Sequence, residues 1–108
     1  MSCLGIESTA HTFGASIVSE SGTILSDVRD IYRSTPGKGI HPREAADHHS
    51  EVAAKVLLAA FKTARTNPDE LSGVSIALGP GLGPCLRVGA TVARALSSYL
   101  NVPLVPVT

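Results

Sequence analysis

The chain has 108 residues, and its nine Lys or Arg residues balance nine Asp or Glu residues, so its formal net charge is zero. Phosphate binding relies mainly on Lys and Arg charge, and this balance argues against the chain holding nucleic acid by itself. The length allows at most one domain, covering residues 1–108. Hydrophobic residues make up 44% of the chain, with two Phe, two Tyr and no Trp, so we expect a core of Ala, Val, Leu and Ile.

Cysteine usage and the chain start indicate a cellular compartment. Cys3 and Cys85 lie far apart and form no CxxC pair, which favours two free thiols in a reducing cytosol over a disulfide or a metal site. The start lacks the basic and apolar regions of a signal peptide, and the longest apolar run is far short of the ~20 residues that span a membrane. We therefore expect a cytoplasmic chain with no membrane partner.

The first third of the chain predicts three short strands. The alternating apolar runs cover residues 3–6, 14–19 and 23–32. Residues 20–22 (Glu-Ser-Gly) are of types that tolerate a tight turn, so an antiparallel meander is expected. Residues 34–40, with one Pro and two Gly, are expected to form a loop.

A helix is predicted over residues 43–65, with Pro42 in its first turn. Its apolar stripe follows helical spacing and contains Ala45, His49, Val52, Ala53, Val56, Ala60 and Ala64. Leu57 and Phe61 widen the stripe. Glu51 and Lys55, four residues apart, are spaced to form an ion pair on the solvent-exposed side of the helix.

The last third predicts a buried strand at residues 74–78, a helix at 85–100 and a fifth strand at 104–107. The order β-β-β-α-β-α-β predicts an α/β fold with a mixed sheet. This is the ribonuclease-H-like order found in each lobe of the actin-like and sugar-kinase ATPases.

Residues 5–14 form the first segment with possible chemistry. A short polar turn between two strands offers backbone N–H groups and hydroxyls to a phosphate or to metal-bound water. The alternative is an ordinary hairpin in which Ser and Thr make local hydrogen bonds.

Residues 79–84, Gly-Pro-Gly-Leu-Gly-Pro, form the second segment. Glycines allow close backbone approach, and the following helix N-terminus favours anions. The segment does not match GxxxxGK[ST], and a tight strand-to-helix connection is the alternative.

His41, His48 and His49 form the third segment. A metal site needs converging ligands, whereas adjacent residues on a helix diverge by about 100°. We therefore expect His49 to be a core or interface histidine rather than a metal ligand.

Three stretches, residues 4–14, 39–49 and 79–90, together resemble the family of the catalytic KEOPS subunit and its bacterial counterpart TsaD, formerly labelled O-sialoglycoprotein endopeptidase. The resemblance runs along the whole chain. The bacterial branch usually has Asp-Glu where this chain has His11-Thr12, and the sequence His-Pro-Arg-Glu-Ala at residues 41–45 also points to the archaeal branch.

This resemblance implies that the chain is most of the N-terminal lobe of an actin-like ATPase (ASKHA) fold, without the second lobe. The intact protein would transfer threonylcarbamoyl from its adenylate to the adenosine beside the tRNA anticodon. It would use ATP or the adenylate and a divalent metal, namely iron, zinc or magnesium. The family's metal-binding histidine pair lies outside this chain, so we expect no metal ligands here, no bound cofactor and no activity of the piece alone. Residues implied to line the cleft are Glu7, Thr9, His11, Thr12, Gly81 and Gly83.

A second reading is a partner-binding module. In the resembling complexes the small dimerising KEOPS subunit packs on helices of this lobe, beside a kinase subunit and tRNA. The residues expected to contact it are His49, Val56, Leu57 and Leu96. The old metallopeptidase label depends on the histidine pair that lies outside this chain. A sugar-kinase-like lobe would need an acidic first turn, which His11-Thr12 does not supply. The sequence therefore disfavours both of these alternative functions.

Overall fold

The computed structural model describes residues 1–37 and 39–108 and shows a five-stranded mixed sheet with two long helices. The predicted loop at residues 34–40 includes position 38, which lies outside the described residues. The elements, in chain order, are β1 Ser2–Glu7, β2 Thr12–Ser19, β3 Ile24–Ile31, α1 Pro42–Ala64, a 3-10 turn Pro68–Glu70, β4 Leu71–Ala77, α2 Gly83–Leu100 and β5 Leu104–Val107.

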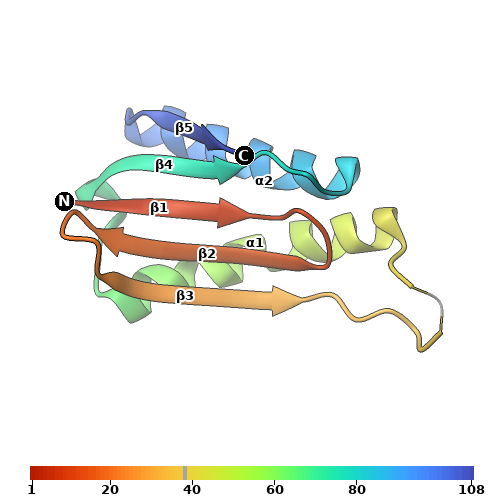
Figure 1. Ribbon diagram of the computed structural model, residues 1–108. Helices are drawn as coiled ribbons and strands as arrows, with labels where there is room; N and C mark the ends of the chain where they lie inside the picture. The colour runs from red at the N-terminus through yellow and green to blue at the C-terminus, as the bar shows by residue number, and fades with distance from the viewer. Residues whose placement is uncertain (38) are drawn as a thin grey trace.

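The strands lie in the order β3-β2-β1-β4-β5 (Figure 1). β1, β2 and β3 pair antiparallel, while β4 pairs parallel to β1 and β5 pairs parallel to β4. This arrangement confirms the predicted meander followed by two helical crossovers. The element bounds differ from the prediction mainly at β4, which begins at Leu71 because that residue already pairs with Ser2 across an irregularity in the ladder.

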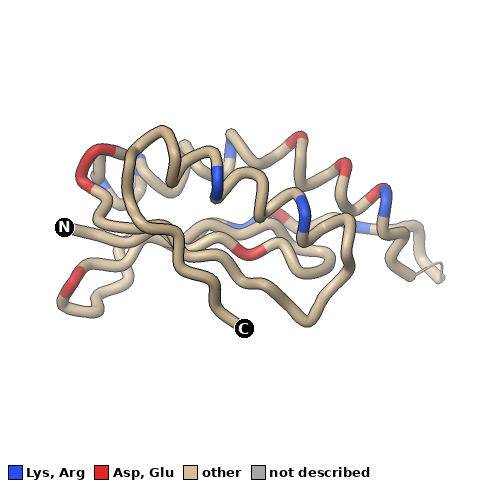
Figure 2. The backbone as a smooth tube through the Cα atoms, turned by 90° about the horizontal axis from the view of Figure 1, so that it is seen from above, with Lys and Arg blue, Asp and Glu red and all other residues tan. Residues whose placement is uncertain are grey.

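Both helices cover the same face of the sheet, so the molecule has one helical layer and one sheet layer (Figure 2). The covered face carries the apolar core, which contains Leu4, Ile6, Phe13, Ala15, Ile17, Val74 and Ile76 from the strands. Because side chains alternate along a strand, the residues between these core positions point to the opposite, open face. The sequence therefore sorts large apolar side chains to one face and mostly small or polar ones to the other.

Helix α1 starts and stops where its end residues predict. Pro42 occupies its first turn, the His41 ring accepts a hydrogen bond from the Glu44 backbone N–H, and Arg65 ends it in a left-handed conformation. Its buried residues, Ala45, His49, Ala53, Val56 and Ala60, form the stripe that the spacing predicts.

Two residues on that stripe correct an expectation about partners. The side chain of His49 is 0% exposed and that of Val56 is 1% exposed, because both pack against the sheet. The expectation that they contact a partner is wrong, since their surfaces are already used inside the chain. Leu57 and Leu96 are half-buried against the same core, and their contact with a partner stays a prediction.

Helix α2 carries small residues where it approaches the sheet. Cys85, Gly89 and Ala93 are buried at a spacing of four residues, so one narrow side of the helix lies against β1 and β4. This close approach brings the start of α2 beside the residues that follow β1. Neither helix within the described ranges is long and apolar enough to span a bilayer.

Candidate functional site

The candidate site lies where β1 and β4 end. These two strands are parallel neighbours, so their carboxyl ends meet at one edge of the sheet. Two connections leave from there, residues 8–11 after β1 (the first turn) and residues 78–82 after β4 (the glycine loop). In open α/β sheets, ligands bind outside the carboxyl ends of the strands, which makes this edge the expected place for a site.

The glycine loop packs directly on the first turn. The Leu82 backbone N–H donates to the Thr9 carbonyl oxygen over 2.7 Å. A Cβ atom placed on Gly81 would overlap that same carbonyl group, so only glycine allows the two segments to lie this close. The close approach predicted from the glycine-rich sequence is therefore present.

Glu7 and Thr9 form a local unit within the first turn. Both the backbone N–H and the hydroxyl of Thr9 donate to Oε1 of Glu7, the N–H over 2.7 Å. The carboxylate is thereby oriented at the end of β1 and can accept further hydrogen bonds, from metal-bound water or from a ligand hydroxyl or amine. Local hydrogen bonds of this kind were also expected for an ordinary hairpin, and the structure contains both these bonds and the contact with the glycine loop.

The structure separates the other predicted cleft residues from this unit. His11 is exposed, and its carbonyl accepts the Tyr32 backbone N–H over 2.7 Å. Thr12 is half-buried at the start of β2, opposite Ile31 in the ladder. Gly83 begins α2, and a Cβ atom there would meet only the Arg87 guanidinium one turn along the same helix. The contacts thus join Glu7, Thr9 and Gly81 and place Gly83 apart from them.

Ser8 is a buried member of the first turn that sequence reasoning missed. Its hydroxyl donates to the Cys85 carbonyl oxygen over 2.8 Å and accepts from the Gly89 N–H over 3.0 Å. In a regular helix these two groups bond each other, so Ser8 inserts between two partners of one helical turn. A Cβ atom on Gly89 would overlap the Ser8 hydroxyl. The available signal was a glycine at the expected buried position of a helix, where it is otherwise unfavourable.

The two adjacent histidines contact the turn from the other side. His49 Nε2 lies 2.7 Å from the Ala10 carbonyl oxygen, and the Nδ1 atoms of His48 and His49 lie 2.8 Å apart. The expected divergence of the two rings is wrong, because the rings meet with their centroids 5.0 Å apart. His48 Nε2 lies 2.8 Å from Asp30, and the burial of His49 lowers its pKa.

Asp30 of β3 accepts bonds from two residues of α1. Lys55 Nζ lies 2.9 Å from Asp30, so the lysine reaches the sheet instead of pairing with Glu51 as expected. Hydrogen bonds from Lys55 and then His48 lower the pKa of the Asp30 carboxyl, which is therefore ionised at neutral pH.

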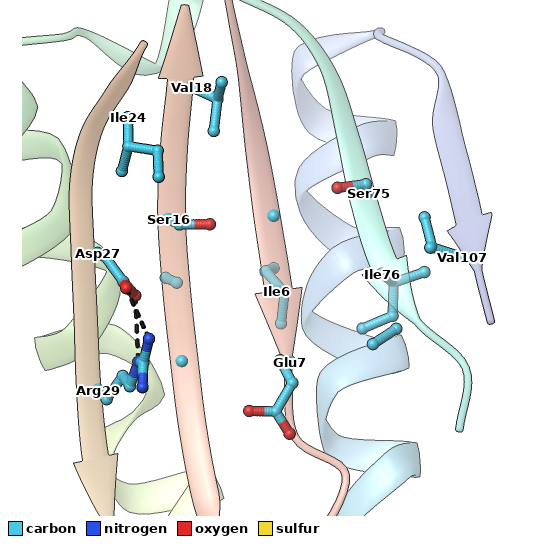
Figure 3. Close-up of a pocket in the computed structure, with 14 residues that line it drawn as sticks. Ile6, Glu7, Ser16, Val18, Ile24, Asp27, Arg29, Ser75, Ile76 and Val107 are labelled. Atoms are coloured by element: carbon cyan, nitrogen blue, oxygen red, sulfur yellow. Dashed lines mark hydrogen bonds and ion pairs between the residues drawn. The ribbon is translucent and has the colours of Figure 1, made fainter. Parts of the chain in front are cut away.

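A hollow of 420 Å³ opens on the uncovered face of the sheet and begins at Glu7 (Figure 3). Small residues in the strand centres make the room, and Asp27 and Arg29 form an ion pair of 2.8 Å at its edge. The bond to Asp27 raises the pKa of Arg29. The hollow is further lined by Gly5, Gly14, Ser16, Ser75, Ala77 and Val107. The glycines inside strands were the sequence signal for such a space.

Thiol and metal chemistry find little support among the residues described. Cys3 and Cys85 are free, as predicted, and burial raises the pKa of the Cys85 thiol, which keeps it protonated and a poor nucleophile. In residues 1–37 and 39–108, no three His, Cys, Asp or Glu side chains converge as metal ligands would. The resemblance implies a divalent metal in the intact protein with its ligands outside this chain, and that expectation stays a prediction.

Solved structures define the class of fold. The chain resembles YeaZ from Pseudomonas aeruginosa with a TM-score of 0.79 at 15% identity, covering 100% of this chain and 45% of that one. It also resembles Thermus thermophilus RuvC in complex with a Holliday junction substrate, with a TM-score of 0.57 at 12% identity, covering 99% of this chain and 64% of that one. These likenesses show the fold, and the chain is an α/β unit of the ribonuclease-H-like and actin-like class.

Sequence relatives then identify the family. The family model described as TsaD: tRNA N6-adenosine threonylcarbamoyltransferase matches residues 23–108, and the chain belongs to this family. Proteins named tRNA N6-adenosine threonylcarbamoyltransferase are 57% identical in Hyperthermus butylicus and 51% identical in Methanopyrus kandleri. The matches cover 96% and 99% of this chain, but only 29% and 31% of those proteins. The chain thus spans about a third of the length of its curated relatives, and both of these relatives are archaeal.

Proposed function

We propose that this chain forms most of the first lobe of a tRNA N6-adenosine threonylcarbamoyltransferase, and that the first turn and glycine loop line its cleft. The observation that carries the proposal is the 57% identity to a named transferase over 96% of the chain. The packing of Gly81 on Thr9 supports it, because it pairs two motifs of the resemblance that lie some 70 residues apart at one sheet edge.

In this proposal the whole protein transfers a threonylcarbamoyl group from its adenylate to a tRNA adenosine. The Glu7 carboxylate, held by Thr9, would orient a water, hydroxyl or amine at the cleft. Being negative, it does not suit direct contact with the adenylate phosphate. The proposed cofactors remain ATP or the adenylate with a divalent metal, in a cytoplasmic protein.

A chimera tests the proposal. Residues 1–108 would replace the matching segment of the Hyperthermus butylicus relative, and the chimera would be incubated with threonylcarbamoyl-adenylate and tRNA. Mass spectrometry of the digested tRNA is expected to show threonylcarbamoyladenosine. Glu7→Gln should lower the transfer rate at least tenfold, whereas Glu20→Gln, an exposed acidic residue in the next hairpin, should leave it unchanged. A folded chimera without transfer would contradict the proposal.

A second candidate function is partner binding through the helical layer. Leu58 on α1 is 71% exposed and Tyr99 on α2 is 87% exposed, so both large side chains are open to solvent. Between the helices lies a groove of 310 Å³, lined by Ser50, Ala53, Arg87, Val88, Thr91 and Val92. Large exposed side chains and a groove on one helical layer are features that an interface can use. The proposed partners are the small KEOPS subunit, the kinase subunit and tRNA of the intact complex.

Calorimetric titration with the small KEOPS subunit tests this second function. Because Val56 is in the core, Leu58→Asp is the suitable variant, and it should weaken binding at least tenfold without unfolding the chain. Ser21→Asp, in the exposed turn between β2 and β3, is the matched control. Equal affinity of the two variants would place the interface elsewhere.

A further inference from the structure

A chain of three hydrogen bonds links the surface to the first turn through two rings. It runs from the Asp30 carboxylate to His48 Nε2, from His48 Nδ1 to His49 Nδ1, and from His49 Nε2 to the Ala10 carbonyl, at 2.8, 2.8 and 2.7 Å. All four ring nitrogens are used. His49 is fully buried, and its ring also lies beside the Phe13 ring.

The two end groups of this hydrogen-bond network, the Asp30 carboxylate and the Ala10 carbonyl, determine how many protons the network holds. A carboxylate and a carbonyl oxygen can only accept hydrogen bonds, so every bond in the chain needs a proton from a ring nitrogen. Three bonds need three protons, whereas two neutral imidazoles carry two. The completed network therefore requires one extra proton and one positive charge on the pair.

We propose that His48 and His49 share one extra proton, and that this charged pair is a positioning device that holds the Ala10 carbonyl and so fixes the first turn. The positioning role rests on the proposed function of that turn, whereas the proton count does not. Loss of the extra proton must break one of the three bonds. The hydrogen bonding that holds the first turn therefore depends on pH.

The surroundings place the charge on the outer ring. His48 Nε2 lies 2.8 Å from the Asp30 carboxylate, whereas the His49 ring is fully buried, so we assign the positive charge of the pair to the outer ring. Lys55 shares that carboxylate, and Tyr32, bonded to Glu44, lies beside the His48 ring. On the turn side, Glu7 favours and His11 disfavours the charged form of His49.

The pair also polarises the first turn. The Ala10 carbonyl accepts a hydrogen bond from His49, which in the proposal is bonded to a cationic His48. Hydrogen bonds linked in this way polarise and strengthen one another. Polarisation of that carbonyl makes the N–H of the same peptide group, which belongs to His11, a stronger donor. The turn would then present a better donor to an anionic group, such as the phosphate of an acyl-adenylate.

Nitrogen-15 NMR of the chain labelled at histidine counts the protons directly. At pH 7 we expect three protonated nitrogens among the four of His48 and His49, and a scalar coupling between the two Nδ1 atoms across their hydrogen bond. Only two protonated nitrogens, or no coupling, would overturn the proposal. Neither result depends on transferase activity, so failure here differs from failure of the proposed function.

Asp30→Asn and Asp27→Asn are the variants to compare. The side-chain amide introduced by Asp30→Asn can donate to a neutral His48, so the pair keeps its bonds without the extra proton, which should leave the rings at a lower pH than in the wild type. Asp27 lies on the same strand but pairs with Arg29, so Asp27→Asn should not change the pH at which the histidine pair loses its third proton. Release of the third proton at the same pH in Asp30→Asn and the wild type would overturn the assignment. In the Hyperthermus chimera, Asp30→Asn should raise the KM for the adenylate several-fold with little change in kcat, because the neutral pair no longer polarises the Ala10 carbonyl, and an unchanged KM would overturn that polarisation.

Discussion

Two hairpin turns of this sheet are built in different ways. The turn at residues 20–23, between β2 and β3, is exposed. It is held by local bonds among Ser19, Ser21 and Thr23 and by contacts of Glu20 with Met1 at the chain start, and it bonds to neither helix. The first turn, between β1 and β2, is bonded to both helices and to the glycine loop through Ser8, Thr9 and Ala10. A turn that only reverses the chain needs local bonds alone, so the extra contacts at the first turn indicate that its conformation itself matters.

The two helices hold the first turn by different physical means. Helix α2 does so by close packing, since Gly89 leaves room for the Ser8 hydroxyl. Helix α1 does so through His49, whose ring belongs to a hydrogen-bond network that ends on the ionised Asp30 carboxylate. The first contact should depend on volume and the second on charge, and this difference can be tested.

Gly89→Ala should have the largest effect. Alanine normally favours a helix interior over glycine by about 1 kcal/mol, but here its Cβ atom would overlap Ser8. We expect a net loss of about 3 kcal/mol in the free energy of unfolding, measured by urea denaturation. Gly83→Ala on the same helix, where only the flexible Arg87 side chain is near, should be neutral or stabilising. A stabilised Gly89→Ala would show that the packing is loose.

His49→Phe should come next. The substitution keeps an aromatic ring but leaves the half-buried Ala10 carbonyl without its partner, at a cost of about 2 kcal/mol in unfolding free energy. His11→Ala, at an exposed side chain of the same turn, should change the unfolding free energy by less than about 0.5 kcal/mol. Equal effects of the two variants would remove the special role of His49.

Ser8→Ala should cost less, about 1 kcal/mol, because the Cys85 carbonyl and Gly89 N–H can bond each other once the hydroxyl is gone. The same urea denaturation would measure it, with Ser98→Ala on the exposed side of α2 as control. A loss as large as that of Gly89→Ala would mean that the helix cannot close its own bond.

A pH series gives the smallest expected effect. Burial holds the folded-state pKa of His49 below its ordinary value of about 6.5, so below that pH the unfolded chain binds a proton that the folded chain does not. The unfolding free energy should therefore decrease as the pH falls from about 6.5 to 5, and His49→Phe should flatten this decrease. The pKa of Asp30 is also lowered, and its contribution is lost only below about pH 4. A flat wild-type curve between pH 5 and 6.5 would contradict the account.

Much of the fold followed from local pattern. The stripe from Ala45 to Ala60, the proline at the start of α1 and the alternating strands were visible in the sequence, and the mixed sheet followed from their succession. The glycine at position 81 also predicted a close backbone approach, although not which segment would approach.

The rest depended on tertiary geometry. Adjacent helical positions predict diverging rings, yet the His48 side chain turns back so that its Nδ1 meets that of His49. Lys55 reached Asp30 on a strand instead of Glu51 on its own helix. The side chains of His49 and Val56 are of types found at interfaces, but both are buried between α1 and the sheet. Such choices are set by what packs nearby, which spacing alone does not contain.

Amide hydrogen exchange of the two turns tests the central comparison most directly. The N–H groups to follow are that of Thr9 in the first turn, that of Leu82 in the glycine loop, which bonds to the first turn, and those of Gly22 and Thr23 in the other turn, since all four donate hydrogen bonds. The account predicts that Thr9 and Leu82 exchange at least tenfold more slowly, after correction for intrinsic rates, because the turn cannot open without releasing both helices. Equal protection in the two turns would show that the first turn is an ordinary hairpin.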